Sequence, residues 1–215
     1  MDLQRFFEFD PGEDPAWLAR RQLGDTARRL ADRCVDAEPD VASLERAVEH
    51  VEAALAVLTP GETPAQAYAS GRFHQRPAVF LDRSAMFGHC NPVAPPMGLR
   101  WEEEVARCTM AFGLRHGGAP GIVHGGLIAA ALDQVSGYCA TMAGRSGLTI
   151  RLNTRYRRAV PVGLELEFDA RVVEQTERAT EIHARCVAAD VVYAESTGTF
   201  ARMDRERMRA VLGGA

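Results

Sequence analysis

The residues best suited to chemistry lie in one short stretch of the chain. His124-Gly125-Gly126 leads directly into an apolar helical run that carries a single carboxylate, Asp133. Glycines at a helix start expose backbone N–H groups that have no intrahelical acceptor, and the helix dipole adds positive potential there. Such an end can hold an anion or a developing oxyanion. Because Asp133 is the only charged residue between His124 and Gly144, and a lone carboxylate in an apolar run either costs stability or has a task, the stretch predicts a functional site.

The spacing within this stretch predicts a site shared between two subunits. His124 and Asp133 are nine residues apart, which is about 2.5 helical turns and roughly 13 Å along a helix axis. Asp133 is therefore expected to point away from the side that carries His124. If both residues serve one site, a second copy of the chain supplies one of them. The motif thus indicates a homodimer with its active site at the interface.

The residues around the motif carry a resemblance to a known family. The segment from Leu148 to Gly163 follows the helical run and contains Thr, Asn, Tyr, Pro and Gly landmarks in order, while Cys90-Asn91-Pro92 and Gly98-Leu99 precede the first expected strand. With His124-Gly125-Gly126 and Asp133, these landmarks resemble hotdog-fold thioesterases of the phenylacetyl-CoA thioesterase type. The resemblance covers roughly residues 85 to 204.

The resemblance implies roles for individual residues. The Gly126 N–H would polarise a thioester carbonyl, and Asp133 would act as general base on water or as nucleophile. Thr149 would lie near the attacking water, and His124 would line the site or orient the helix start. The substrate-binding residues implied in addition are Gly125, Gln134, Asn91, Arg151, Arg155 and Arg157, the three arginines as contacts for coenzyme A phosphates.

Each of these roles has a structural alternative. The glycines could simply allow close packing of the helix start, and Asp133 could organise a buried hydrogen-bond network. Thr149 could be an ordinary strand residue, and the arginines a solvated sheet face. The chain also departs from some relatives, which place an Asn about six residues before the His, where this sequence has Gly118.

Composition excludes several classes of function. The net charge of −4 gives no reason to expect nucleic acid, and all 25 basic residues are Arg. Five cysteines without close pairing argue for a reducing compartment. No metal-ligand spacing, nucleotide fingerprint or transmembrane-length apolar run is present, and the first residues lack a signal-peptide pattern. We therefore expect a cytoplasmic protein without a metal or redox cofactor, with coenzyme A only as part of the substrate.

The expected organisation has four parts, which are an N-terminal helical extension (1–60), a connector (61–98), a hotdog domain (99–204) and a C-terminal tail (205–215). In the extension, Asp14-Pro15 predicts a helix start. Leu23, Ala27, Leu30 and Cys34, and then Leu44, Val48, Val51, Leu55 and Leu58, recur at helical spacing. The two helices form a hairpin whose apolar stripes need a partner, which could be the other helix, the hotdog body or a second subunit.

In the connector, residues 78–81 are a strand candidate and residues 84–96 a loop. One strand over 99–112 and a helix over 123–142 follow. Four further strands are expected at 148–158, 164–175, 179–188 and 191–203, with tight turns at 177–178 and 189–190. The predicted class is therefore α+β, a hotdog fold in which an antiparallel sheet wraps a long central helix.

The leading functional hypothesis is an acyl-CoA thioesterase that hydrolyses a medium-chain, long-chain or aryl acyl thioester as a homodimer or homotetramer. The alternative is a non-catalytic protein that binds acyl-CoA or an acyl carrier. A hotdog dehydratase or hydratase would need a different order of motif residues, which the sequence does not contain.

Overall fold

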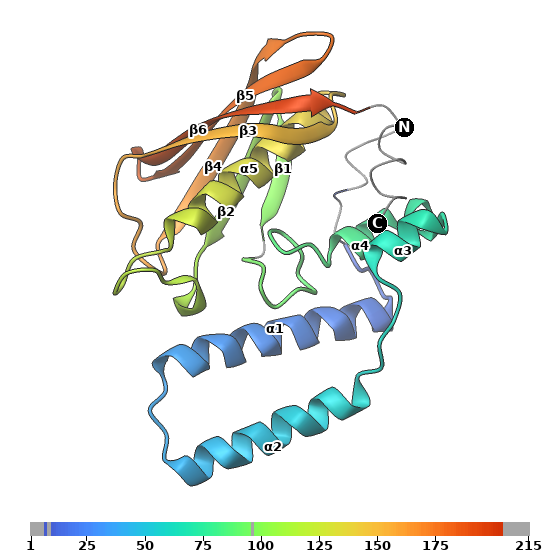
Figure 1. Cartoon of the computed structure of the whole chain (residues 1–215), viewed down its shortest axis with the longest axis vertical. Helices are drawn as coiled ribbons and strands as arrows, with labels where there is room; N and C mark the ends of the chain where they lie inside the picture. Colours follow the sequence, from blue (N-terminus) through green and yellow to red (C-terminus); the bar gives the residue numbers. More distant parts are fainter. Residues whose placement is uncertain (1–6, 8–9, 96, 204–215) are drawn as a thin grey trace.

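The computed structural model describes residues 7, 10–95 and 97–203 of the chain. A curved antiparallel sheet wraps one long helix, α5, and two further long helices, α1 and α2, lie to one side of this body (Figure 1). The sheet and its central helix form the hotdog arrangement that the sequence predicts. The predicted C-terminal tail, 205–215, lies outside the described residues.

The N-terminal helical hairpin forms as predicted. Helix α1 spans Pro15–Asp36 and begins at an N-cap, Asp14, whose side chain accepts hydrogen bonds from the backbone N–H groups of Ala16 and Trp17. Helix α2 spans Val41–Val57, and its N-cap is Asp40. An aspartate at this position satisfies backbone donors that the first helical turn leaves free. The four-residue break between the helices therefore ends in a helix-starting signal.

The connector is more helical than the sequence suggests. It contains α3 (Pro64–Ala69), a 3₁₀ turn, η2 (Arg72–His74), and α4 (Pro77–Leu81). The strand predicted at residues 78–81 is wrong, because Pro77 takes the N1 position of a single helical turn, where its missing N–H costs nothing.

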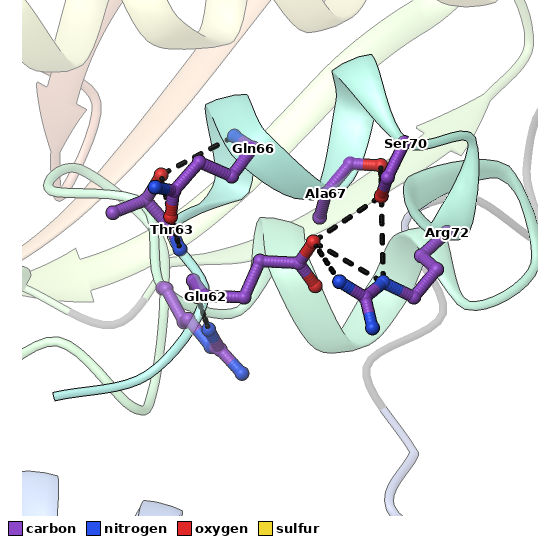
Figure 2. A network of polar contacts seen from close by, with 7 residues as sticks. Glu62, Thr63, Gln66, Ala67, Ser70 and Arg72 are labelled. Carbon is purple, nitrogen blue, oxygen red and sulfur yellow. Dashed lines mark hydrogen bonds and ion pairs between the residues drawn. The ribbon is translucent and has the colours of Figure 1, made fainter. Parts of the chain in front are cut away.

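A polar network fixes the start of the connector. The Glu62 carboxylate accepts hydrogen bonds from the hydroxyl of Ser70 and the guanidinium of Arg72, while Arg83 donates to the Glu62 backbone carbonyl (Figure 2). Thr63 and Gln66 form a capping box at the start of α3. These contacts hold a segment rich in proline and small residues in one conformation.

Six antiparallel strands form the sheet in the order β1-β2-β4-β5-β6-β3. The bounds are β1 Gly98–Glu102, β2 Val105–Ala111, β3 Gly147–Tyr156, β4 Glu165–Gln175, β5 Ala179–Ala188 and β6 Val191–Arg202. The single strand expected over 99–112 is wrong, because Glu103 and Glu104 adopt positive φ values of 51° and 61° and make a hairpin turn. The apolar positions change phase across Glu102–Glu104, from Leu99 and Trp101 to Ala106, Cys108 and Met110, and the expectation of one strand overlooked this change.

Helix α5 spans Gly125–Met142 and packs on the inner face of the sheet. It begins two residues later than predicted, because Val123 forms a β-bridge with Gly117 and His124 is the N-cap. Side chains of Leu132, Val135 and Tyr138 are buried between helix and sheet. Burial on this face sets which residues of α5 stay open for chemistry.

The outer face of the sheet carries a row of charged residues that crosses all six strands. The register aligns Arg100, Arg107, Asp169, Arg185, Glu195 and Arg155 in order from β1 to β3. Arg185 donates to both oxygens of the buried Asp169 at 3.2 and 2.8 Å, and this hydrogen bonding raises the pKa of Arg185. Opposite charges on directly paired residues stabilise their strand register.

A buried carboxylate joins α1 to the connector. Asp82, fully buried at the end of α4, accepts hydrogen bonds from Trp17 Nε1 at 2.6 Å and Arg21 Nε at 2.7 Å. It also accepts from the backbone N–H of His89 and the thiol of Cys90. Every partner is needed, because a charge taken out of water is tolerated only when it is paired and hydrogen-bonded.

We predict that Asp82→Asn lowers the free energy of unfolding by about 3 kcal/mol, because the substitution breaks the ion pair with Arg21 at a mostly buried site. Chemical denaturation measures the change. Asp36→Asn is the matched control, since Asp36 makes only an exposed ion pair, with Arg33 of the same helix, and should cost less than about 1 kcal/mol. Equal losses in the two variants would contradict this role for Asp82.

Candidate functional site

The start of α5 is organised by the ring of His124. Its Nδ1 accepts a hydrogen bond from the Gly126 N–H at 3.0 Å, so the histidine caps its own helix. The Gly126 amide, predicted to polarise a substrate carbonyl, is therefore engaged by His124 in this structure. Among the described residues no acceptor contacts the N–H of Gly125. The open donor at this helix end is thus one residue earlier than the sequence suggests.

Asp133 meets Thr149 at the other end of the site. The Thr149 hydroxyl donates a hydrogen bond of 2.8 Å to Asp133 Oδ1. Asp133 is half-buried in the isolated chain, on the side of α5 that faces strand β3. The two residues are sixteen positions apart in sequence, and the turn between α5 and β3 brings them together. The structure therefore joins two of the residues that the sequence singled out.

Strand β3 also contacts the start of the helix. The Tyr156 hydroxyl donates a 2.9 Å hydrogen bond to the Gly125 carbonyl, and the ring lies against Gly125, where an added Cβ would approach it to 3.5 Å. A β-bulge at Ile150 interrupts the pairing of β3 with β6. Tyr156 was only a landmark of the resemblance, and its contact with the helix start carried no separate sequence signal.

The loop before the helix leaves no room for a side chain at Gly118. Its N–H donates to the Ile122 carbonyl at 2.8 Å, and a Cβ at this position would lie 2.9 Å from His124 Cα. Such an approach is closer than real Cβ atoms tolerate without a shift of the backbone. The glycine that departs from some relatives is therefore required here by the way the loop crosses the helix start.

A buried histidine supports this loop. His116 Nδ1 accepts from the Gly113 N–H and Nε2 lies 3.3 Å from the Val93 carbonyl, which together fit the neutral ring with the proton on Nε2. Burial lowers the pKa of His116 below its ordinary value of 6.5. Its backbone carbonyl accepts the N–H of His124. His116 thus ties the loop to the residue that caps α5, a role that the sequence did not indicate.

The N-terminal helix reaches the same loop. Asp32 of α1 accepts from the backbone N–H of Arg115 at 2.9 Å and from its guanidinium at 2.6 Å. Arg115 directly precedes His116 in the 3₁₀ turn η3, Leu114–His116. Nothing in the sequence links residues eighty-three positions apart, so this contact could be found only from the fold.

The remaining predicted residues lie in three places. Gln134 is half-buried beside Asp133. Asn91 holds the connector loop, since its side chain donates to the Arg83 carbonyl and accepts from the Val93 N–H. Arg151 and Arg155 pair with Thr199 and Glu195 on the outer face of the sheet, and Arg157 forms an ion pair with Glu195.

The described part of the chain contains no group of three His, Cys, Asp or Glu side chains placed to hold a metal ion. None of its helices is both long and apolar enough to span a bilayer. The predicted absence of a cofactor stays a prediction.

We predict that His116 makes the protein less stable as pH falls. Because its folded pKa lies below 6.5, the unfolded chain takes up this proton first, and the stabilisation present above pH 6.5 is lost as pH falls through the lowered value. One such proton changes the unfolding free energy by up to about 1.4 kcal/mol per pH unit. Denaturation at pH 7.5 and 5.5 should show a smaller difference for His116→Asn, whereas His50→Asn, on exposed α2, should match the wild type. An unchanged difference in His116→Asn would contradict the role of this ring.

We also predict that Gly118→Ala destabilises the fold by about 1–3 kcal/mol, because its Cβ overlaps the backbone of His124. Thermal unfolding measures the loss. Gly61→Ala provides the control, since an added Cβ there meets nothing within 4 Å. A Gly118 variant as stable as the control would show that the loop moves aside freely.

Part of the chain is similar in sequence to known proteins. Residues 120–195 match the family model of the thioesterase superfamily. Over 93 residues the chain is 32% identical to acyl-coenzyme A thioesterase THEM5 of Mus musculus, which covers 41% of this chain and 37% of that protein. It is 28% identical over 108 residues to acyl-coenzyme A thioesterase THEM4 of Bos taurus, covering 49% and 44%. The matched region thus spans less than half the length of either relative.

A solved structure of a thioesterase superfamily protein has a similar fold. It aligns over 84% of this chain and 94% of its own, with a TM-score of 0.71 and 24% identity. That likeness concerns the fold alone, whereas the family model covers the segment with His124, Asp133 and Thr149. Residues 120–195 of this chain thus resemble the thioesterase superfamily, and the fold around them is similar to that of a solved member.

Proposed function

We propose that this protein is an acyl-CoA thioesterase that hydrolyses a medium-chain, long-chain or aryl acyl thioester. The observation that carries the proposal is the hydrogen bond from Thr149 of β3 to Asp133 of α5. The N-terminus of the same helix presents the open N–H of Gly125. A carboxylate beside a hydroxyl can hold and deprotonate a water, and a helix N-terminus can stabilise the oxyanion that forms. The names of the curated relatives support the substrate class.

The proposed reaction is a water attack on the thioester carbonyl. Asp133 takes a proton from the water as the new C–O bond forms, and Thr149 holds the carboxylate through its hydrogen bond. The carbonyl oxygen becomes an oxyanion beside the Gly125 N–H and the positive end of α5. When the C–S bond breaks, the thiolate of coenzyme A leaves and takes up a proton. The energy of binding the pantetheine arm is available to position the carbonyl.

One chain alone does not complete this site. Gly125 and Asp133 are eight residues apart on α5, roughly 12 Å along the axis, which is too far for both to contact one carbonyl group. Strand β3 is an edge of the sheet, and edge strands are ready to pair with a second copy. We propose a homodimer in which Asp133 of one subunit faces the helix start of the other. A tetramer of two such dimers is compatible with the same site.

The other predicted residues keep secondary roles in the proposal. His124 orients the helix start by capping it, and Gln134 and Asn91 line the path of the substrate. Arg151, Arg155 and Arg157 are proposed contacts for the phosphates of coenzyme A by charge-assisted hydrogen bonds. The cytoplasmic location expected from the cysteine pattern remains a prediction.

We predict that Asp133→Asn lowers kcat for acyl-CoA hydrolysis by at least about a thousandfold, because the amide cannot accept the proton from water. Thr149→Ala should lower kcat by about ten- to a hundredfold, since it loosens the same carboxylate. Free-thiol release from short, long and aromatic acyl-CoA thioesters measures both. Asp190→Asn, in the exposed turn between β5 and β6, is the control and should retain wild-type turnover.

The same panel separates the enzyme from its alternative. If wild type binds acyl-CoA in calorimetry but releases no thiol from any substrate, the protein is a non-catalytic acyl-CoA or acyl-carrier binding protein. The lack of space for an Asn side chain at Gly118 is the observation that favours this second function. Turnover that survives Asp133→Asn would instead remove Asp133 from the mechanism.

A further inference from the structure

Helix α2 presents an apolar face that the described part of the chain does not cover. The helix has no buried residue, and only Ser43 among its residues is even partly shielded. One side of the helix and its C-cap carries the α2 stripe, five side chains that are 37% to 60% exposed. These are Leu44, Val48, Val51, Leu55 and Leu58.

Helix α1 carries a second exposed stripe beside its docked face. Trp17, Gly24 and Arg28 face the connector and are buried. Around the helix from them lie Leu23 and Leu30, 46% and 42% exposed, with the partly buried Ala27 and the exposed Cys34. These four residues form the α1 stripe. Figure 1 shows α1 between the sheet and α2, with the two helices running antiparallel.

An amphipathic helix without a partner is not stable by itself. Most helical stability in proteins comes from packing of the apolar face against a partner rather than from the helix alone. Helix α2 has 17 residues, and its Asp40 cap satisfies only the first turn. Contiguous apolar surface of this kind marks a protein interface. The α2 stripe therefore needs a partner that the described part of one chain does not provide.

The charges beside the stripes identify that partner. Helix α2 carries three glutamates, Glu45, Glu49 and Glu52, against one arginine, and in the described part of the chain no ion pair joins these glutamates to a basic side chain. Helix α1 carries five arginines against three aspartates. Its Arg29 and Arg33 make only exposed ion pairs within their own helix. Acidic α2 and basic α1 thus complement each other in charge, and each carries an exposed apolar stripe.

We propose that the helical hairpins of two copies of this chain pack together, with the α2 stripe of each copy against the α1 stripe of the other. A two-fold interface requires one surface to be self-complementary. A hairpin with one basic and one acidic helix, each with an apolar stripe, meets this requirement, because the same contact between α1 and α2 forms once in each direction. A membrane surface fits less well, because helices that lie on anionic lipid are rich in basic residues on their polar face, whereas that of α2 is acidic.

A thiol cross-linking experiment tests the proposal on the full-length protein. Cys34 lies in the α1 stripe and is exposed. Burial raises the pKa of the Cys90, Cys108 and Cys186 thiols to about 12 and that of Cys139 to about 11, so these four react slowly with maleimides. Leu44→Cys and Leu55→Cys add a thiol near either end of the α2 stripe. Ala53→Cys, on the opposite side of α2, is the control.

We expect a short bis-maleimide to convert at least one stripe variant to a two-chain product at least tenfold faster than it converts Ala53→Cys. A product of single-chain mass in which the linked peptides join the new thiol to Cys34 would overturn the proposal in favour of a hairpin that closes on itself. Equal rates for both stripe variants and the control would also overturn it.

Hydrogen exchange gives a second measurement that does not depend on the cysteine variants. Val48→Glu should speed amide exchange throughout α2, because the stripe can no longer be buried, whereas Ala53→Glu should leave α2 as protected as in wild type. Equal protection in the two variants would overturn the proposal. Neither experiment uses acyl-CoA, so its outcome is separate from that of the proposed thioesterase activity.

Discussion

The burial of the Asp82 carboxylate is the constraint on which the N-terminal half of the structure depends. A fully buried charge must be surrounded by donors, and here those donors come from α1 and from the loop at 89–90. Once α1 is held in this place, Asp32 reaches Arg115, which precedes the histidine that supports the helix cap. A contact far from the proposed chemistry is therefore linked, through α1 and this loop, to the start of α5.

The site itself is held by two small hydrogen-bonded pairs rather than by a buried network. Thr149 holds Asp133 where one end of α5 meets β3, and Tyr156 holds Gly125 at the other end. In the single chain both ends are partly open to water, where electrostatic interactions are weak. Covering by a second copy would lower the local dielectric and strengthen the attraction between an oxyanion and the helix end. Dimerisation would thus contribute to the chemistry as well as supply the missing group.

Local signals predicted the parts of the fold that depend on neighbours in sequence. The Asp14-Pro15 start of α1, the central helix and all four strands after it were predicted, and β5 has the predicted bounds, because turn residues and alternation are both local. The prediction for residues 78–81 was wrong because a short apolar run is compatible with either a strand or a helix. The turn at Glu103 was missed because non-glycine residues adopt its positive φ values only rarely. Asp133 and Thr149 were predicted as a pair only through the resemblance. The partners of Asp82, and the link from Asp32 to Arg115, depend on tertiary packing, which a single sequence does not encode in any short pattern.

The bulge at Ile150 makes the length of β3 part of the site. Thr149 and Tyr156 are seven residues apart, an odd number, so in a regular strand their side chains would leave the sheet on opposite faces. The extra residue restores the alternation, and both side chains reach α5. A chain that lost this one position would keep every proposed catalytic residue, but the side chain of either Thr149 or Tyr156 would point away from α5. When sequences of this kind are aligned, the count of residues between the threonine and the tyrosine therefore carries information that their identities do not.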